Sequence, residues 1–385
     1  MAGVYGGYWL SAEYPGSLYG QWIGSSEGEP EGRIVMDLDK VGSRLRGLIY
    51  LYPDDRSIPA SCAPIDIDDN VSAAEVSAPA SHFLAGTGYV PSWAELHKEF
   101  PDIDFPTKVE GVIQVTGENT IQLKWKTSVG SYGTGVLTKS ITPSLSRISK
   151  VEQVDTWQSF MDHITSNPSN GKVYRGQGAP WSLKSGFHRT ARRDLKRYFD
   201  EDIPQLHRAL SARTKHVFNL GNAIETGAFM NLVQHHGYPT PLLDWTLSPF
   251  IAAYFAFRDA KGSGNDCVRI FCFESEHYRK SVQQYNNLTF QAPHFSIVEA
   301  LSIENERAVP QQAVLTLTNI EDVEMHLLQL EHYTGEFLTA FDIPRSEAHV
   351  ALSNLRLMGI TEATLFPGVD SICSTLKKQN FTFQN

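Results

Sequence analysis

Cysteine is scarce in this chain of 385 residues, and its four copies lie far apart in the sequence. They are Cys62, Cys267, Cys272 and Cys373. Their spacing is unlike that of zinc ligands or of a small disulfide framework. We therefore expect reduced thiols, no bound metal and a cytoplasmic location.

Long apolar runs are missing as well. No run approaches the roughly 20 residues that an α-helix needs to span a bilayer. The first residues, from Met1 to Tyr8, lack the basic region and apolar stretch of an export signal. These absences predict a protein without a membrane partner.

The chain has fewer basic than acidic residues. It contains 33 lysines and arginines and 43 aspartates and glutamates, which gives a formal net charge of −10. A nucleic acid wrapped around the whole surface is therefore disfavoured, although a local basic patch is compatible with this total. The sequence also has no P-loop, Gly-x-Ser-x-Gly elbow or His-Glu-x-x-His motif. Hydrolases and metalloenzymes of those kinds are disfavoured too.

The residues that are present divide the chain in two. Hydrophobic residues make up 41% and charged residues 20%, as in ordinary soluble globular proteins, and the length suffices for two domains. We place a β-rich recognition or scaffold domain at residues 1–145 and a second domain at residues 150–385. The fold class expected for the whole chain is α+β.

The first domain shows short runs of alternating apolar and polar residues from residue 5 to about residue 139. This period of two predicts strands, which we place at 32–39, 45–52, 111–116 and 120–127. A β-sandwich or a small barrel would account for them. Residues 73–108 are rich in Ala, Ser and Pro, and we expect an insertion there with little regular strand.

Three tryptophans of this domain have two interpretations. Trp22, Trp93 and Trp125 either line a ligand groove or pack in the core and at its rim. An unpaired edge of the same sheet would offer a site for a protein partner or for a second copy of the chain.

The second domain mixes helical and strand patterns. We expect helices at 157–166, 190–199, 205–220, 223–236 and 346–358, and strands at 172–175, 266–273 and 312–318. Because the two kinds interleave without strict alternation, a mixed α+β fold is favoured over a doubly wound parallel sheet.

The most informative stretch runs from residue 234 to residue 257. Gly237 is suited to ending a helix, and Pro239 and Pro241 prevent its continuation. Ser248 then fits an N-cap and Pro249 the first position of a new, apolar helix. A helix N-terminus carries free N–H groups and partial positive charge, which suits a phosphate.

Two motifs in this order resemble the FRG domain, which is named for its Phe/Tyr-Arg-Gly motif. The first is Tyr174-Arg175-Gly176-Gln177; the second combines residues 234–237 with residues 242–249. Residues 364–370 also resemble the family's closing segment, so the likeness covers roughly residues 150–375. Members of the family are often suspected of roles in toxin or antiphage systems, and the resemblance implies such a role here.

A more remote similarity is to the ADP-ribosyltransferase superfamily. There, an aromatic-Arg-Gly strand holds NAD, a second strand with its helix supports the nicotinamide, and a later glutamate acts on the ribose. Tyr174 to Gly176 would supply the first element and residues 244–256 the second. The resemblance implies that Arg175 with one of Glu304, Glu306 or Gln312 is catalytic. A glutamate would stabilise the growing oxocarbenium charge better than Gln312, so catalysis depends on which residue takes that place.

Arg175 itself has two interpretations. Its planar, permanently charged guanidinium can donate two hydrogen bonds to a phosphate, or it can pair with a buried carboxylate such as that of Asp244. The resemblance implies a set of NAD-binding residues around it. This set is Tyr174, Arg175, Gly176, Gln177, His235, His236, Asp244, Trp245, Thr246 and Ser248.

Histidines and basic residues complete the candidates. His235 and His236 are adjacent on a helix, so their side chains point about 100° apart and do not face one metal ion. They either contact a ligand or cap the helix end, and His188 is a further candidate for the pocket. One basic run would cover a nucleic-acid backbone or form a solvated helix face diluted by nearby acids. It consists of Arg189, Arg192, Arg193, Lys196 and Arg197.

Two functions follow as hypotheses. In the first, an ADP-ribosyltransferase-like enzyme uses NAD to modify a nucleic acid or a protein, or hydrolyses NAD. In the second, the same pocket binds a nucleotide or a nucleic-acid end without catalysis. The first predicts that Arg175, Asp244 and one of Glu304 or Glu306 converge on one cleft.

Overall fold

The computed structural model describes residues 17–167, 170–260, 266–299 and 301–381. The chain splits into two compact units, each described here by itself. Unit 1 comprises residues 1–140, 190–201 and 289–292; unit 2 comprises residues 141–189, 202–288 and 293–385. Two short segments from the predicted second domain thus belong to unit 1. Residues 5–16 of the expected strand region lie outside the described residues.

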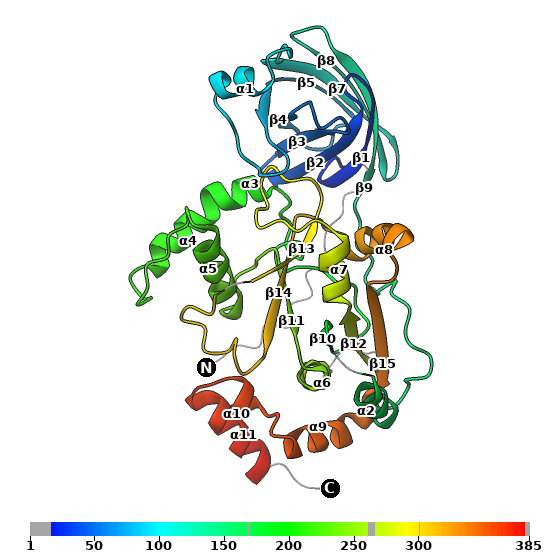
Figure 1. Ribbon diagram of the computed structural model, residues 1–385, viewed down its shortest axis with the longest axis vertical. Helices are drawn as coiled ribbons and strands as arrows, with labels where there is room; N and C mark the ends of the chain where they lie inside the picture. The colour runs from blue at the N-terminus through cyan, green and yellow to red at the C-terminus, as the bar shows by residue number, and fades with distance from the viewer. Residues whose placement is uncertain (1–16, 168–169, 261–265, 300, 382–385) are drawn as a thin grey trace. The chain divides into compact units, whose positions relative to one another are not determined.

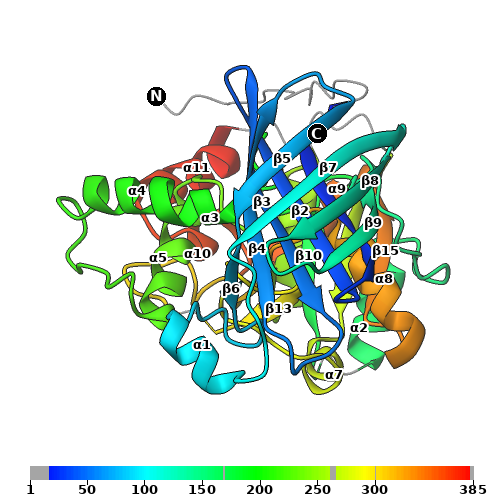
Figure 2. The same cartoon turned by 90° about the horizontal axis from the view of Figure 1, so that it is seen from above.

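Unit 1 is built on nine antiparallel strands in one strongly curved, nearly closed, barrel-like sheet (Figures 1 and 2). Their order across the sheet is β5-β7-β8-β9-β1-β2-β3-β4-β6. The strands are β1 Gly20–Gly28, β2 Gly32–Val41, β3 Arg44–Pro53, β4 Ala60–Asp68, β5 Ala73–Pro79, β6 Ser81–Phe83, β7 Lys108–Gly117, β8 Thr120–Thr127 and β9 Tyr132–Lys139.

Side chains alternate between the inner and outer faces of this sheet. Ile34, Met36 and Leu38 of β2 point into a core that all the long strands share. Asp37 and Asp39 lie between them in the sequence and are therefore on the outer face. Asp39 is fully buried there and accepts hydrogen bonds from the backbone N–H groups of Arg193 and Asp194.

The four strands expected in this unit are confirmed, but the expected insertion at residues 73–108 is wrong. That segment contains β5, β6 and the helix α1, Trp93–Glu99, which opens with a capping box between Ser92 and Glu95. Strand β5 pairs with β7 along its whole length. Its small Ala and Ser residues have weak strand propensity, so only this pairing with β7 reveals it.

Unit 2 contains a six-stranded sheet in the order β13-β14-β11-β10-β12-β15. Its strands are β10 Val173–Gln177, β11 Leu242–Thr246, β12 Cys267–Phe273, β13 Phe295–Val298, β14 Ala313–Thr318 and β15 Leu338–Pro344. The helices of unit 2 are α2 Trp157–Ser166, α4 Ile203–Leu210, α5 Ala223–His235, α6 Pro249–Arg258, α7 Ser275–Ser281, α8 Val323–Thr334, α9 Ala348–Leu357, α10 Glu362–Leu365 and α11 Val369–Phe381.

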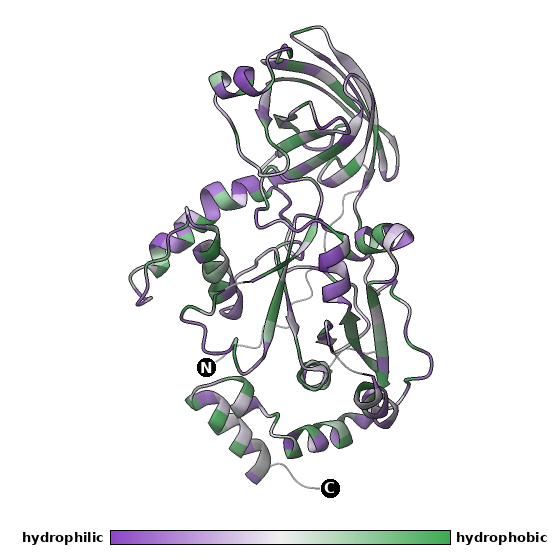
Figure 3. Cartoon of the chain, in the orientation of Figure 1, coloured by the Kyte–Doolittle hydropathy of each residue, from purple (hydrophilic) through white to green (hydrophobic). Residues whose placement is uncertain are grey.

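Apolar side chains are buried on both faces of this sheet. One core joins Tyr174 and Ile270 to α2, α6 and α9, and the other joins Trp245 and Phe271 to Phe295 and α8. Strands β14 and β15 are correspondingly drawn largely in the hydrophobic colour in Figure 3. The α+β class is confirmed.

Expected helices and observed helices agree where local signals suffice. The helix expected at 157–166 coincides with α2, and the one at 223–236 ends at His235. The helices expected at 190–199 and 205–220 are wrong in extent. The chain instead forms the single turn α3, Leu195–Arg197, then a π-helical turn at Tyr198–Asp202 and the short α4. Residues before Leu195 are held out of a helix by hydrogen bonds to Asp39.

Candidate functional site

The candidate site lies where strands β10 and β11 diverge. The two strands are neighbours in the sheet but share a single register pair, Tyr174 with Thr246. Arg175 follows directly after that pair, and its Nη1 donates a 2.6 Å hydrogen bond to the backbone carbonyl of Asp244. A side-chain hydrogen bond therefore joins β10 to β11 beyond the point where backbone pairing stops.

The Arg175 side chain is partly buried and lacks a full set of acceptors. Its Nε atom is shielded from solvent and has no hydrogen-bond partner among the described residues. Burial, together with the positive charge of Arg189, lowers the pKa of Arg175 to about 10, while Asp244 and Asp259 act in the opposite direction. Arg175 stays cationic at neutral pH, so a buried charge with an unused donor is available to an anion.

Gly176 has a packing role that the sequence did not predict. A Cβ atom added to Gly176 would lie 1.8 Å from the backbone oxygen of Ala252. Helix α6 therefore rests directly on strand β10, and its fully buried Ala252, Ala253 and Ala256 allow that approach. The glycine after Arg175 fixes the distance between strand and helix.

The Asp244 side chain is held by a short polar chain. Its Oδ1 atom accepts a 2.5 Å hydrogen bond from Gln234 Nε2, and Gln234 Oε1 accepts one from Thr240 Oγ1. Gln234 is on α5 and Thr240 is in the following loop, so the chain connects helix end, loop and strand β11. Gln234 belongs to the second sequence motif, but the motif alone predicts no role for this residue.

The turn from β11 into α6 has the expected capping. Ser248 is the N-cap of α6 and accepts from Ile251 N at 3.3 Å, and Pro249 is the first helical residue. Thr246 Oγ1 accepts a 3.1 Å hydrogen bond from Ser248 N and so fixes the loop. Gly237, with a φ angle of 85°, follows the end of α5 as predicted.

Comparison with known proteins identifies part of this unit. Residues 170–264 match the model of the FRG domain family, and the match covers both motifs of the candidate site. The chain carries an FRG domain. The match does not include the resembling segment at residues 364–370 or the residues from Glu304 to Gln312.

Two solved structures, both redesigned β-barrels, also resemble the chain. One is named b11L5F_LGL, with 15% identity and a TM-score of 0.23, and the match covers 32% of this chain and 92% of that one. The other is mFAP1 bound to DFHBI, with 14% identity and a TM-score of 0.22, and the match covers 32% of this chain and 94% of that one. A comparison with curated proteins found no match.

Several predicted NAD-binding residues of the FRG domain are core residues. Tyr174 and Trp245 are 1% and 3% exposed and belong to the cores on opposite faces of the sheet. Trp245 Nε1 donates to Thr316 Oγ1 at 2.9 Å, and Gln177 Nε2 donates to the Trp181 carbonyl at 2.9 Å. These side chains hold the sheet together around Arg175.

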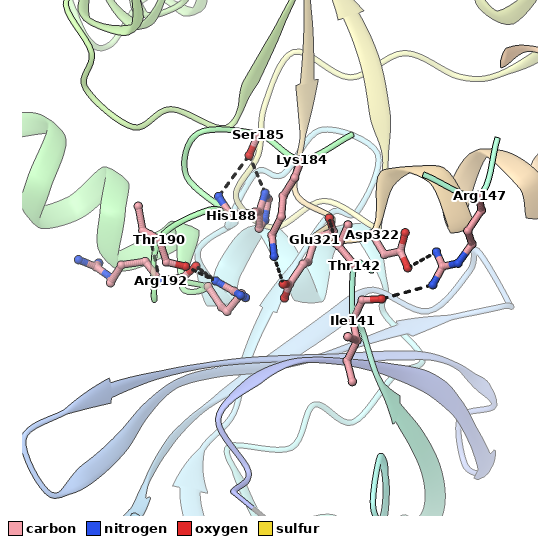
Figure 4. A network of polar contacts seen from close by, with 11 residues as sticks. Ile141, Thr142, Arg147, Lys184, Ser185, His188, Thr190, Arg192, Glu321 and Asp322 are labelled. Carbon is pink, nitrogen blue, oxygen red and sulfur yellow. Dashed lines mark hydrogen bonds and ion pairs between the residues drawn. The ribbon is translucent and has the colours of Figure 1, made fainter. Parts of the chain in front are cut away.

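The histidines of the FRG domain lie at the end of α5 and in the loop after β10. His235 Nδ1 lies 2.9 Å from the Asn231 carbonyl and 2.8 Å from Asn305 Nδ2, while His236 is the exposed C-cap. His188 Nδ1 lies 2.8 Å from Ser185 Oγ in the network of Figure 4. Among the described residues no group of His, Cys, Asp and Glu is arranged to hold a metal ion.

The three candidates for the catalytic carboxylate are spread along one segment. Glu304 is exposed, and its carboxylate accepts a hydrogen bond from the backbone N–H of His216. Glu306 is exposed too. Gln312 lies beside the β11–α6 loop, because its carbonyl accepts from Leu247 N at 3.1 Å. In the described part of the chain, no hydrogen bond or ion pair links Glu304 or Glu306 to Arg175 or Asp244.

The basic run does not form one helical face. Arg192 Nε lies 2.5 Å from Asp39, Lys196 pairs with Asp200, and Arg197 pairs with Glu201 at 2.9 Å. Arg193 is buried and donates to the carbonyls of Thr190 and Arg192. Much of the positive charge of this segment is neutralised within unit 1. Arg189 belongs to unit 2, beside Arg175 and Asp244.

Proposed function

We propose that the FRG domain binds NAD through Arg175 and acts as an ADP-ribosyltransferase-like enzyme on a macromolecule, or hydrolyses NAD. The observation that supports this is the partly buried Arg175 side chain, whose buried Nε has no partner among the described residues where β10 and β11 diverge. A pyrophosphate offers several anionic oxygens and would accept a hydrogen bond from that Nε. It would also repay part of the cost of burying the cation.

The N-terminus of α6 supports the same assignment. This ten-residue helix begins at Pro249 beside the loop that carries Thr246 and Ser248. Its partial positive charge favours an anion next to this loop, which follows the strand that Arg175 contacts. Asp244, held by Gln234, is positioned to accept hydrogen bonds from a ribose hydroxyl or a nicotinamide amide.

The chemical step needs a carboxylate near the nicotinamide ribose. As the bond to nicotinamide breaks, positive charge grows on the ribose, and a carboxylate stabilises that charge. Glu304 and Glu306 are the candidates in this domain. The water or acceptor hydroxyl that attacks must lose a proton, which the same carboxylate would accept.

A second candidate function is nucleotide binding without catalysis. It is favoured by the positions of Gln312 and Glu304: Gln312 lies against the β11–α6 loop, while Glu304 accepts a hydrogen bond from the His216 N–H. An amide would hydrogen-bond a ribose hydroxyl but would stabilise a positive charge poorly. An effector role in a toxin or antiphage system belongs to the first function and rests on the family resemblance.

Incubation of the full chain with NAD, followed by chromatography of nicotinamide, separates these functions. Arg175→Met is the informative variant because it keeps a long side chain and removes the charge. Arg258→Met, at a partly exposed arginine of α6 paired with Asp259, is the matched control. Nicotinamide release lost in the first variant, kept in the second and abolished by Glu304→Gln or Glu306→Gln supports the enzyme.

Other outcomes are equally informative. NAD binding by calorimetry without nicotinamide release would favour the binding module. NAD binding that is unchanged in a folded Arg175→Met protein would contradict both functions. Release that requires added RNA, DNA or protein would identify the class of acceptor.

A further inference from the structure

The interior of the barrel-like sheet in unit 1 is filled unevenly. One end is packed by side chains that are at most 5% exposed. These are Leu18, Trp22, Met36, Leu38, Leu45, Ile67, Ile121 and Leu137. The other end contains a cavity of about 690 Å³ that reaches the loops around Glu31, Asp54 and Val129. The sheet thus forms a cup with one closed end.

The walls of the cavity are apolar. Ile34, Leu51, Ile65 and Leu123 line it from four different strands, and the Trp125 indole lies among them. A space of this size is within the range of pockets that hold a small organic molecule. Water gains few hydrogen bonds against such walls, so replacing it with an apolar ligand is favourable.

Glycines shape this wall as well. A Cβ atom added to Gly133 would lie 2.3 Å from Cζ2 of Trp125. Glycine at this position lets the indole lie flat against strand β9 instead of filling the interior. Trp125 therefore presents an aromatic surface to whatever occupies the cup.

The mouth of the cavity carries mainly negative charge. Its lining includes five exposed acidic residues and the exposed Lys124. The five are Glu29, Glu31, Asp54, Asp55 and Asp104. Such a mouth repels anions and attracts cations, and the effect is strongest at low salt.

We propose that unit 1 binds one apolar small molecule in this cavity, with a neutral or cationic polar end at the mouth, and discriminates against anionic lipids such as fatty acids. The apolar wall supplies the affinity, and the carboxylates supply the discrimination. The site is separate from the proposed NAD site, since all its lining residues lie between Gly28 and Ser131.

Two fluorescent probes with one skeleton test the charge preference in the full chain. N-phenyl-1-naphthylamine is neutral, and 1-anilinonaphthalene-8-sulfonate adds a sulfonate. We expect saturable binding of one neutral molecule per chain and at least tenfold weaker binding of the sulfonate at low salt. Below its micellar concentration, dodecyltrimethylammonium should displace the neutral probe at lower concentration than dodecanoate does.

Adjacent positions on β5 provide a matched pair of variants. Val76 lines the cavity, whereas Ser77 points to the outer face and is exposed. Val76→Trp should weaken binding of the neutral probe at least tenfold, and Ser77→Trp should leave it unchanged. Ser61→Leu, also at a lining position, provides a second test if Val76→Trp fails to fold. Trp125→Phe should remove most of the energy transfer from protein to bound probe.

The proposal is overturned if the neutral probe does not bind, or if Val76→Trp and Ser77→Trp bind it equally when circular dichroism shows both folded. Equal affinity for the two probes would overturn the charge preference. If that preference is real, Glu31→Gln combined with Asp54→Asn should reduce the difference between the probes, and high salt should do the same.

Discussion

The two sheets of this molecule bury their side chains in opposite ways. The six-stranded sheet of unit 2 has a filled core on each face, and at a strand end the Nε atom of the partly buried Arg175 cation has no hydrogen-bond partner among the described residues. The curved sheet of unit 1 encloses its own interior, which is packed with side chains at one end and contains a cavity at the other. A sheet that is packed on both faces can bind a ligand through charged side chains at its strand ends. A barrel-like sheet can bind a ligand in an apolar cavity inside it.

Glycine shows the same difference. In unit 2, Gly176 brings helix α6 onto strand β10, because its missing side chain makes room for the Ala252 backbone. In unit 1, Gly133 makes room for the Trp125 ring at the cavity wall. Gly176 lets a helix and a strand pack closely together. Gly133 keeps the Trp125 ring against the wall of the cavity.

The largest expected effect is that of Gly176→Ala. The added Cβ would meet the Ala252 oxygen at 1.8 Å, and neither backbone can move without separating α6 from β10. We expect a loss of roughly 3 kcal/mol or more in the free energy of unfolding. Gly86→Ala, where nothing lies within 4 Å of the new Cβ, is the control. Equal melting temperatures for the two variants would contradict the packing role of Gly176.

The closed and open ends of the barrel-like sheet provide the next comparison. Leu38 is fully buried at the closed end, and Leu51 lines the cavity. Leu38→Ala should create a new hole and cost about 3 kcal/mol. Leu51→Ala only enlarges an existing space, and it should cost about 1 kcal/mol. Chemical denaturation measures both, and similar losses would mean that the cavity end is packed in solution.

The third expected effect concerns pH. Burial, and to a lesser degree the charge of Asp39, raises the pKa of Asp194 from 3.8 to about 6, although the N–H of Arg197 donates to it. Because the folded-state pKa is raised, the ionised carboxylate destabilises the fold fully above about pH 6. This destabilisation disappears as pH falls to about 4. Asp194→Asn keeps the N-cap and should add on the order of 2 kcal/mol at pH 7.

The check on this prediction is a pH series of unfolding free energies. The Asp194→Asn protein should have a higher free energy of unfolding than the wild type at pH 7, and this difference should disappear near pH 4. Asp200→Asn, at an exposed neighbour, should have the same pH dependence as the wild type. Asp37, whose pKa burial also raises, contributes to the profile of every protein in the series. An advantage independent of pH would contradict the assignment to Asp194.

Local chemistry decided how much the sequence could predict. The end of α5 at Gly237 and the start of α6 at Ser248 and Pro249 depend on residues within one turn, and these predictions are confirmed. The helix expected at 190–199 failed because Asp39, over 150 positions away, binds Arg192 and the Arg193 N–H. No pattern within residues 190–199 contains that partner.

The candidate sites divide in the same way. The motif singles out Arg175 as a candidate, but the buried Nε of Arg175 and its hydrogen bond to the Asp244 carbonyl depend on where β10 leaves β11. The cavity was not predicted either, although Trp125 was named as a candidate for a ligand groove. Which end of a closed sheet is filled depends on side chains from many strands at once.

The smallest expected effects on the free energy of unfolding are those of removing a helix cap. Each unit has a helix with a serine N-cap, so the same substitution can be compared in both. Ser248 caps the buried α6, and Ser92 caps the exposed α1 within a capping box. Ser248→Ala should cost about 1 kcal/mol, because the Ile251 N–H loses its acceptor where water has little access. Ser92→Ala should cost roughly 0.5 kcal/mol, since water can replace the lost acceptor at that exposed helix. Hydrogen exchange followed by mass spectrometry would place each loss in its own helix. A larger loss at Ser92 than at Ser248 would contradict this ranking of the two caps by exposure.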